Sequence, residues 1–166
     1  MAEEYVASLV WEKPALLTAL TRIKNILKNS PMEKDGKFSN LVKKSIHGHD
    51  YFCIEVDDFI HPITSEKVHQ ELIKKLNSTA NAYEIRIDSG PEHYRIIFVP
   101  NVKHKVFLIS FGFTKVNGTN NYLPENLNAN DLTDLYGKLT DTINKSIKNN
   151  INYWLKDEEE KYHEFK

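Results

Sequence analysis

Between residues 81 and 115 the chain alternates short runs of large apolar side chains with turn-forming residues. The apolar runs are Tyr83–Ile87, Tyr94–Val99 and Val106–Phe113. Ser89-Gly90-Pro91 and Pro100-Asn101 separate them. Runs rich in β-branched and aromatic residues, divided by Gly, Pro and Asn, are typical of consecutive antiparallel strands. The pattern therefore predicts a meander of three strands in this part of the chain.

Apolar residues recur at helical spacing on both sides of the meander. After Pro14 they stand three or four positions apart at Leu16, Leu17, Leu20, Ile23 and Leu27, until Asn29-Ser30-Pro31 interrupts them. From about Asn130 the same spacing returns at Leu132, Leu135, Leu139, Ile143 and Ile147, and Ile151, Trp154 and Leu155 extend it. Such spacing predicts two amphipathic helices, each with one apolar face turned inward.

The remaining segments carry shorter patterns. The apolar runs Tyr5–Trp11 and Tyr51–Val56 each predict a strand, and the spacing within 38–46 predicts a short helix. Thr64 or Ser65 is a suitable N-cap for a further helix that runs to about Asn77.

The expected fold class is α+β, with helical elements first, then an antiparallel sheet, then a long C-terminal helix. A chain of 166 residues fits a single domain spanning 1–166. We divide it into an extended N-terminal strand and helix region (1–62), a core (63–125), and a C-terminal helix with an acidic tail (126–166).

Composition narrows the classes of protein to consider. Hydrophobic residues make up 40% and charged residues 27%, as in ordinary soluble globular proteins. The net charge of −1 means that any basic surface must be local. The single cysteine, Cys53, excludes an internal disulfide, and its apolar surroundings favour a buried structural thiol. Neither a membrane-spanning stretch nor a signal peptide is visible, so we expect a cytoplasmic protein without membrane partners.

Three cations lie in or beside the predicted meander: Arg86, Arg95 and Lys115. Cations on a sheet can face an anionic ligand, and a phosphate backbone is the commonest one. Strand alternation places Arg95 on the face opposite Tyr94. The competing interpretation is local ion pairing, of Arg95 with Asp88 or Glu92 and of Arg86 with Glu84 or Asp88.

Two groups of histidines are weaker candidates for a functional role. His93 and His104 flank the meander and suit proton carriers, although exposed turn histidines are the simpler interpretation. The cluster His47-Gly48-His49-Asp50 lacks the third well-placed ligand that a catalytic metal needs, so we expect neither a metal nor a cofactor.

From Leu72 to about Tyr122 the chain resembles the RelE/ParE toxin superfamily, and especially its HigB-like, phage-derived branch. The resemblance rests on Tyr83-Glu84-Ile85-Arg86-Ile87, Tyr94-Arg95-Ile96-Ile97-Phe98, the run Val106–Gly112 and Phe113-Thr114-Lys115. A helix over Ser65–Asn77 would match the family's second helix. The resemblance implies a RelE-like curved antiparallel sheet, with 63–125 as the RelE-like core.

The same resemblance implies a function. The chain would be the toxin of a type II toxin–antitoxin system, a ribosome-dependent endoribonuclease that cleaves mRNA without a metal and is restrained by a cognate helix-turn-helix antitoxin. Arg95 matches the family's phosphate-binding arginine, Arg86 and Lys115 match further basic positions, and Tyr122 corresponds to a tyrosine beyond the last strand. These four residues are the candidate catalytic set.

A second hypothesis comes from a different class of protein. The near-neutral charge and the long amphipathic helix favour a phage or mobile-element protein that keeps the fold, lacks nuclease activity and acts by binding a protein partner. Inhibition of gyrase is a further variant within the toxin family.

Overall fold

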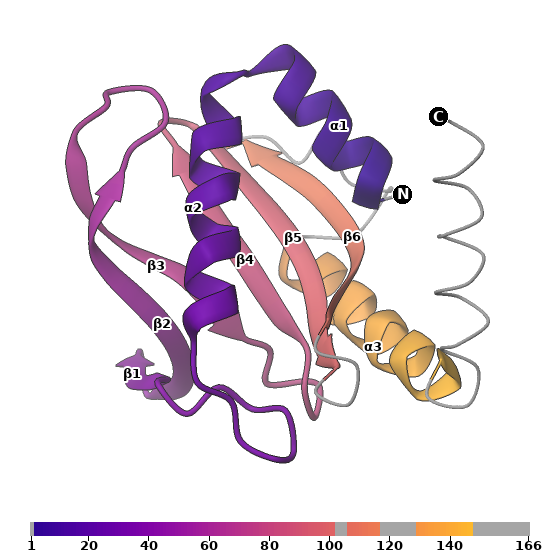
Figure 1. Ribbon diagram of the computed structural model, residues 1–166. Helices are drawn as coiled ribbons and strands as arrows, with labels where there is room; N and C mark the ends of the chain where they lie inside the picture. The colour runs from indigo at the N-terminus through magenta and orange to yellow at the C-terminus, as the bar shows by residue number, and fades with distance from the viewer. Residues whose placement is uncertain (1, 102–105, 117–128, 148–166) are drawn as a thin grey trace.

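The computed structural model describes residues 2–101, 106–116 and 129–147 (Figure 1). Two helices, α1 (Ala2–Glu12) and α2 (Ala15–Asn29), precede the sheet, and α3 (Ala129–Ile147) follows it. The strands are β1 (Val42–Ile46), β2 (His49–Ile60), β3 (Lys67–Lys75), β4 (Tyr83–Ser89), β5 (Glu92–Asn101) and β6 (Val106–Val116). The α+β class, with N-terminal helices and a C-terminal helix, is therefore confirmed.

Six strands form one antiparallel sheet in which sequence order equals spatial order, from β1 to β6. The predicted meander is confirmed as β4, β5 and β6. Gly90 has a φ of +65°, a left-handed conformation that glycine adopts without strain, and it makes the tight turn from β4 to β5. The sheet is not strongly curled, in contrast to the curved sheet that the resemblance implied.

Successive side chains of a strand point to opposite faces of the sheet. Both faces carry apolar side chains, and a different helix packs on each. Helix α2 packs its buried residues Leu16, Ile23 and Leu27 on the face that carries Ile96. Helix α3 lies against the opposite face, where Tyr136 packs on the cluster that contains Ile97 (Figure 1). The α2 prediction is confirmed, except that Leu17 is exposed.

The segment predicted as a helix from Thr64 or Ser65 to Asn77 is strand β3 instead. Val68, Leu72 and Leu76 stand four positions apart, a spacing that fits one face of a helix as well as one face of a strand. Strand β3 also contains an irregularity: Ile54 pairs with Ile73 but the next residue, Glu55, pairs with Glu71. Leu72 is the extra residue, and both Leu72 and Ile73 are buried. A bulge of this kind breaks the period of two on which strand recognition depends.

Two N-terminal predictions were also wrong. Residues 5–11, expected as a strand, lie in helix α1, whose Tyr5 ring packs on β6 beside Gly112. An apolar run as short as this one fits a helix as well as a strand. Residues 38–46, expected as a short helix, end in the edge strand β1, whose Val42 and Ile46 are exposed rather than turned inward. The strand predicted at 51–56 is confirmed within the longer β2.

Helix α3 forms where the sequence predicted it, but it turns a different face to the sheet. Leu132 and Thr140 are buried, and Tyr136 stacks on Phe111 with ring centroids 4.4 Å apart. Leu135 and Leu139 of the predicted apolar stripe are exposed. The extension at Ile151, Trp154 and Leu155 lies outside the described residues.

Candidate anion-binding site

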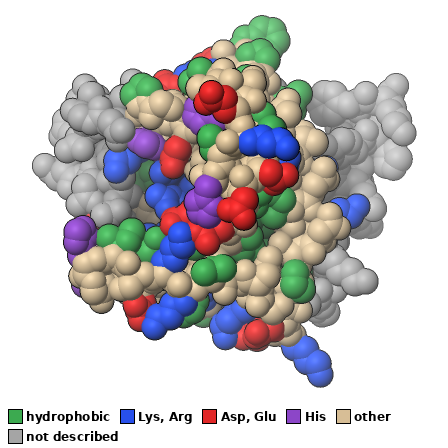
Figure 2. Space-filling model, turned by 90° about the vertical axis from the view of Figure 1, so that its left-hand side faces the viewer, with side chains coloured by type: hydrophobic (Ala, Val, Ile, Leu, Met, Phe, Trp, Pro, Cys, Tyr) green, Lys and Arg blue, Asp and Glu red, His purple; other side chains and the backbone are tan. Residues whose placement is uncertain are grey.

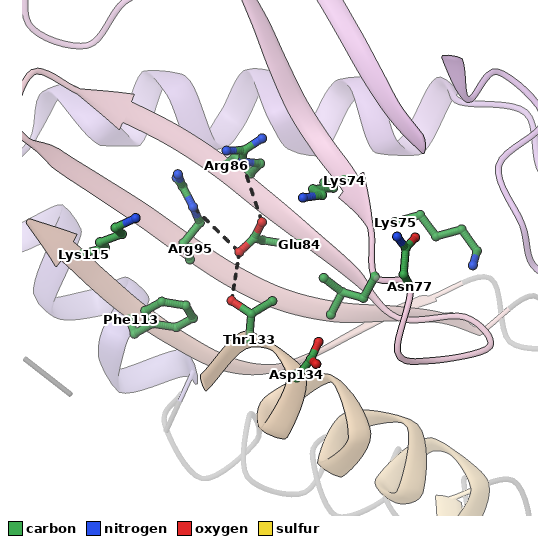
Figure 3. A pocket seen from close by; sticks show the side chains of 11 residues that line it. Lys74, Lys75, Asn77, Glu84, Arg86, Arg95, Phe113, Lys115, Thr133 and Asp134 are labelled. Carbon is green, nitrogen blue, oxygen red and sulfur yellow. Dashed lines mark hydrogen bonds and ion pairs between the residues drawn. The ribbon is translucent and has the colours of Figure 1, made fainter. Parts of the chain in front are cut away.

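A pocket of about 310 Å³ lies between the sheet and the first turns of α3 (Figure 3). Its basic side chains come from β3, β4, β5 and β6: Lys74, Lys75, Arg86, Arg95 and Lys115. Its acidic side chains are Glu84 and Asp134. The structure thus brings together three of the four candidate residues from the sequence, while Tyr122 lies outside the described residues.

Strand register explains why these cations meet. Arg86 on β4 is the direct partner of Arg95 on β5, so the two side chains share a face of the sheet. Arg95 in turn pairs with Phe113 on β6, and Lys115 follows two residues later on the same face.

The Arg95 guanidinium is held by carboxylates. Its side chain is only 9% exposed, and its Nη1 donates to Asp88 Oδ1 at 2.9 Å and to the Tyr94 carbonyl at 3.0 Å. Its Nε lies 3.7 Å from Glu84 Oε1. Asp88 was one of two predicted local partners and is confirmed. The other, Glu92, pairs with Lys13 instead.

Glu84 connects three elements at the floor of the pocket. Its side chain is 8% exposed and forms ion pairs at 3.7 Å with both Arg95 and Arg86. It also accepts a hydrogen bond of 3.3 Å from Thr133 Oγ1 of α3. A buried carboxylate without such compensation would be strongly destabilising, so Glu84 ties β4 to β5 and α3 only while both guanidiniums are present.

The Arg86 guanidinium is also paired with carboxylates. Its Nη1 donates to Glu71 Oε2 at 3.1 Å, and its buried Nε has the long ion pair to Glu84 but no hydrogen bond. Local pairing with Glu84 was predicted, whereas the contact with Glu71 was missed because 64–77 was expected to be a helix.

Asp88 remains ionised at neutral pH. Burial alone would raise its pKa, but the charge of Arg95 and hydrogen bonds from His93 and Arg95 outweigh that effect and lower the pKa to about 2. His93 lies on β5 rather than in a turn, with Nδ1 2.8 Å from Asp88 Oδ1. His104 lies outside the described residues.

The lysines of the pocket differ from its arginines. Among the described residues, no carboxylate lies within 4.0 Å of the ammonium groups of Lys74, Lys75 or Lys115. Lys74 Nζ lies 4.9 Å from the centre of the Tyr51 ring, a cation–π contact. Lys74 and Lys75 were not singled out in the sequence, because 64–77 was expected to be a helix. In the structure Lys74 is the cross-strand partner of Glu84, which places Lys74 on the face of the pocket.

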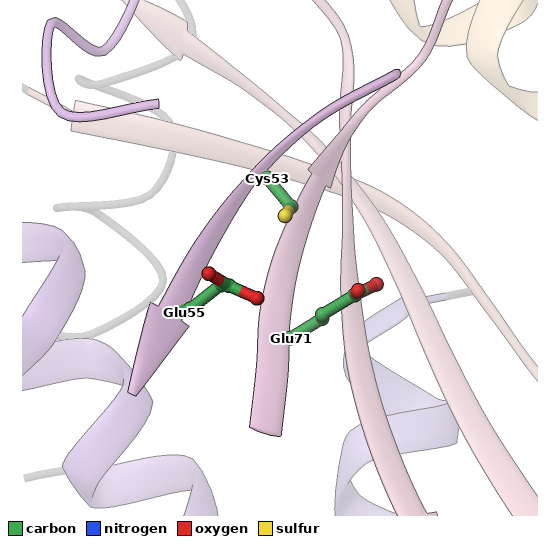
Figure 4. Close-up of side chains that lie close together, drawn as sticks. All are labelled: Cys53, Glu55 and Glu71. Atoms are coloured by element: carbon green, nitrogen blue, oxygen red, sulfur yellow. The ribbon is translucent and has the colours of Figure 1, made fainter. Parts of the chain in front are cut away.

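A network of ion pairs continues from Arg86 through Glu71 to Lys44 and Glu55 on β1 and β2. Figure 2 shows side chains of both signs gathered with histidines on one face. Within this network Cys53, Glu55 and Glu71 place their ligand atoms within 4.8 Å of one another (Figure 4). Burial raises the pKa of Cys53 to about 11, so its thiol stays protonated at neutral pH. Lys44 forms ion pairs with both glutamates. We therefore assign an ion-pair network here and no metal site. The buried thiol predicted at Cys53 is confirmed.

In the described part of the chain, no helix has both the length and the apolar character that crossing a bilayer requires. No family model, no curated protein and no solved structure matches this chain. The contacts, burial and charges of the pocket residues are therefore the basis for a function.

Proposed function

We propose that this protein is a binding module that lacks nuclease activity and docks a protein partner at the polar face of its sheet. The observation that carries the proposal is the state of Arg95, which is nine-tenths buried and held by Asp88 and Glu84. A guanidinium that stabilises a phosphate must offer free N–H groups to the phosphate oxygens. Removing one partner of a buried ion pair costs roughly 3–5 kcal/mol, so releasing Arg95 is expensive.

The other charged groups support the same function. Arg86 is paired with Glu71, and His93 is bound to Asp88, so neither an open phosphate clamp nor an unengaged imidazole stands beside Arg95. The lysines around the pocket keep ammonium groups available. Lys115 is exposed, whereas Lys74 and Lys75 are half-buried. Solvent-accessible charges of this kind steer and select a protein partner more than they add affinity.

Co-purification tests the proposal directly. The tagged chain should recover one protein partner that rebinds when both are purified, and strong expression should leave growth unimpaired. The charge reversals Lys74→Glu and Lys115→Glu together should weaken rebinding. The matched reversals Lys24→Glu and Lys28→Glu, at exposed positions of α2, should not. Growth arrest accompanied by cleaved mRNA would overturn the proposal.

The second candidate is the ribosome-dependent endoribonuclease toxin that the RelE-like resemblance implies. One observation favours it: Arg86, Arg95 and Lys115, the cations matched to the family, line one pocket. It requires ribosome-dependent mRNA cleavage in a purified translation system, loss of cleavage in Lys115→Ala, and suppression by a cognate helix-turn-helix antitoxin that covers the pocket. Absence of cleavage by the intact chain would eliminate it.

A further inference from the structure

The positive charge of the pocket is concentrated in its lysines. Five basic side chains face two acidic ones in the lining. The two arginines are neutralised by Glu84 and by their neighbours Asp88 and Glu71. Among the described lining residues, the positive charge without a carboxylate partner is therefore that of Lys74, Lys75 and Lys115, and Asp134 at the start of α3 offsets one of these three charges.

These lysines stand at separate points of the pocket. Figure 3 shows Lys115 on one side and Lys74 and Lys75 on the other, with Glu84 and the arginines between them. Lys74 on β3 and Lys115 on β6 are three strand spacings apart, roughly 14 Å at about 4.8 Å for each spacing, so a single compact anion cannot contact both. A ligand that carries several negative charges along an extended chain can do so.

The groups that remain available suit carboxylates better than phosphates. Bidentate recognition of phosphate depends on a free guanidinium fork, and here Nη1 of each fork already bonds a carboxylate, Glu71 in the case of Arg86 and Asp88 in the case of Arg95. Lysine ammonium groups are point charges without a preferred planar geometry. Single-stranded RNA binding also depends on aromatic rings on which bases stack, and the ring of the pocket, Phe113, belongs to a residue that is only 8% exposed.

From these observations we infer that the pocket binds an acidic peptide segment, whose spaced carboxylates contact Lys115 at one side and Lys74 and Lys75 at the other. The inference rests on the binding function proposed above and specifies the chemistry of the partner. Leu76 and Phe113 lie beneath the pocket but are buried, so the lysine ammonium groups supply the contacts to the peptide. The ion pairs of Arg95 and Glu84 hold the floor of the pocket in place before the segment binds.

Fluorescence anisotropy of labelled hexaglutamate with the full chain at low salt tests the inference. Lys115→Gln and Lys74→Gln should each weaken binding by about two- to fivefold, as expected for solvent-accessible charges, and the double variant by about tenfold. The control pair Lys24→Gln and Lys28→Gln on α2 removes the same charge away from the pocket and should change binding less than twofold.

Four results would overturn the inference. One is an equal loss of binding in the control pair, which would show non-specific attraction. Another is tighter binding of hexauridylate than of hexaglutamate, which would support the nuclease candidate. The third is a phosphoserine peptide that binds more than tenfold tighter. The fourth is that hexaglutamate does not bind. If hexaglutamate fails while a purified partner still rebinds, only the carboxylate chemistry falls and the binding function stands.

Discussion

Arg86 and Arg95 are direct cross-strand partners, so two like charges face each other in the middle of the sheet. Like charges directly opposite on antiparallel strands are destabilising. Here Glu84 forms an ion pair with each guanidinium, and Glu71 and Asp88 take one more each. The pair is therefore tolerated only as part of a carboxylate network, and that network decides what the site can do.

Glu84→Gln should destabilise the protein by roughly 3 kcal/mol, because it leaves two partly buried guanidiniums without their shared carboxylate. Urea denaturation followed by circular dichroism measures the change. Asp35→Asn is the matched control, since the Asp35–Lys37 ion pair is exposed to solvent and should contribute little to stability. A Glu84→Gln variant as stable as the control would contradict the network.

Low pH should remove the stabilisation of the folded state that the ionised Asp88 carboxylate provides. Its pKa is lowered from 3.8 to about 2 in the folded protein. A lowered carboxyl pKa stabilises the folded state above the unfolded pKa, and this stabilisation is lost as the pH falls from 3.8 towards 2. Asp88→Asn should therefore be less stable than the parent chain at pH 7, and the two should converge near pH 2. Denaturation curves at both pH values measure this, and a gap that persists in acid would refute the assignment.

The stabilisation that His69 contributes should be lost as the pH rises, the reverse of the dependence expected for Asp88. Hydrogen bonds to Asp57 and Glu55 raise its pKa above 6.5. A raised histidine pKa gives stabilisation that is complete below 6.5 and is lost as the pH rises through the folded-state pKa. NMR titration of the imidazole should show the raised pKa, and Asp57→Asn should lower it. An unchanged titration in that variant would show that Asp57 is not the main cause.

Gly112→Ala should loosen α1 from the sheet. A Cβ at this position would overlap the Tyr5 ring, which also forms a hydrogen bond to Thr114 Oγ1 at 2.9 Å. Overpacking of this kind costs typically 1–3 kcal/mol. Thermal denaturation measures the loss of stability.

The double variant Tyr5→Ala with Gly112→Ala separates this contact from other effects. Once the ring is removed, the alanine at 112 has no Tyr5 atoms to displace, so Gly112→Ala should cost much less in the Tyr5→Ala background. Equal costs in the two backgrounds would show that the glycine is required for another reason.

Local sequence patterns were sufficient for the elements whose period is regular. The meander β4–β6 follows from uninterrupted runs between Gly, Pro and Asn residues, and α2 and α3 follow from apolar residues at spacings of three and four. The cations Arg86, Arg95 and Lys115 could be named for the same reason, since strand alternation assigns a face to each residue. Strand β3 could not be recognised, because the spacing of four between Val68, Leu72 and Leu76 also fits a helix and the bulge at Leu72 interrupts the alternation that identifies a strand.

What the sequence by itself determined is therefore the α+β class, the meander and the presence of cations on its polar face. Only the tertiary structure decided how those cations are used. Burial of Arg95 depends on Asp88 and Glu84, on Thr133 of α3, and on a register that no single segment specifies. The physical reason is that periodicity is a property of neighbouring residues, whereas the charge state and accessibility of a side chain depend on groups that meet only after the sheet and α3 have packed.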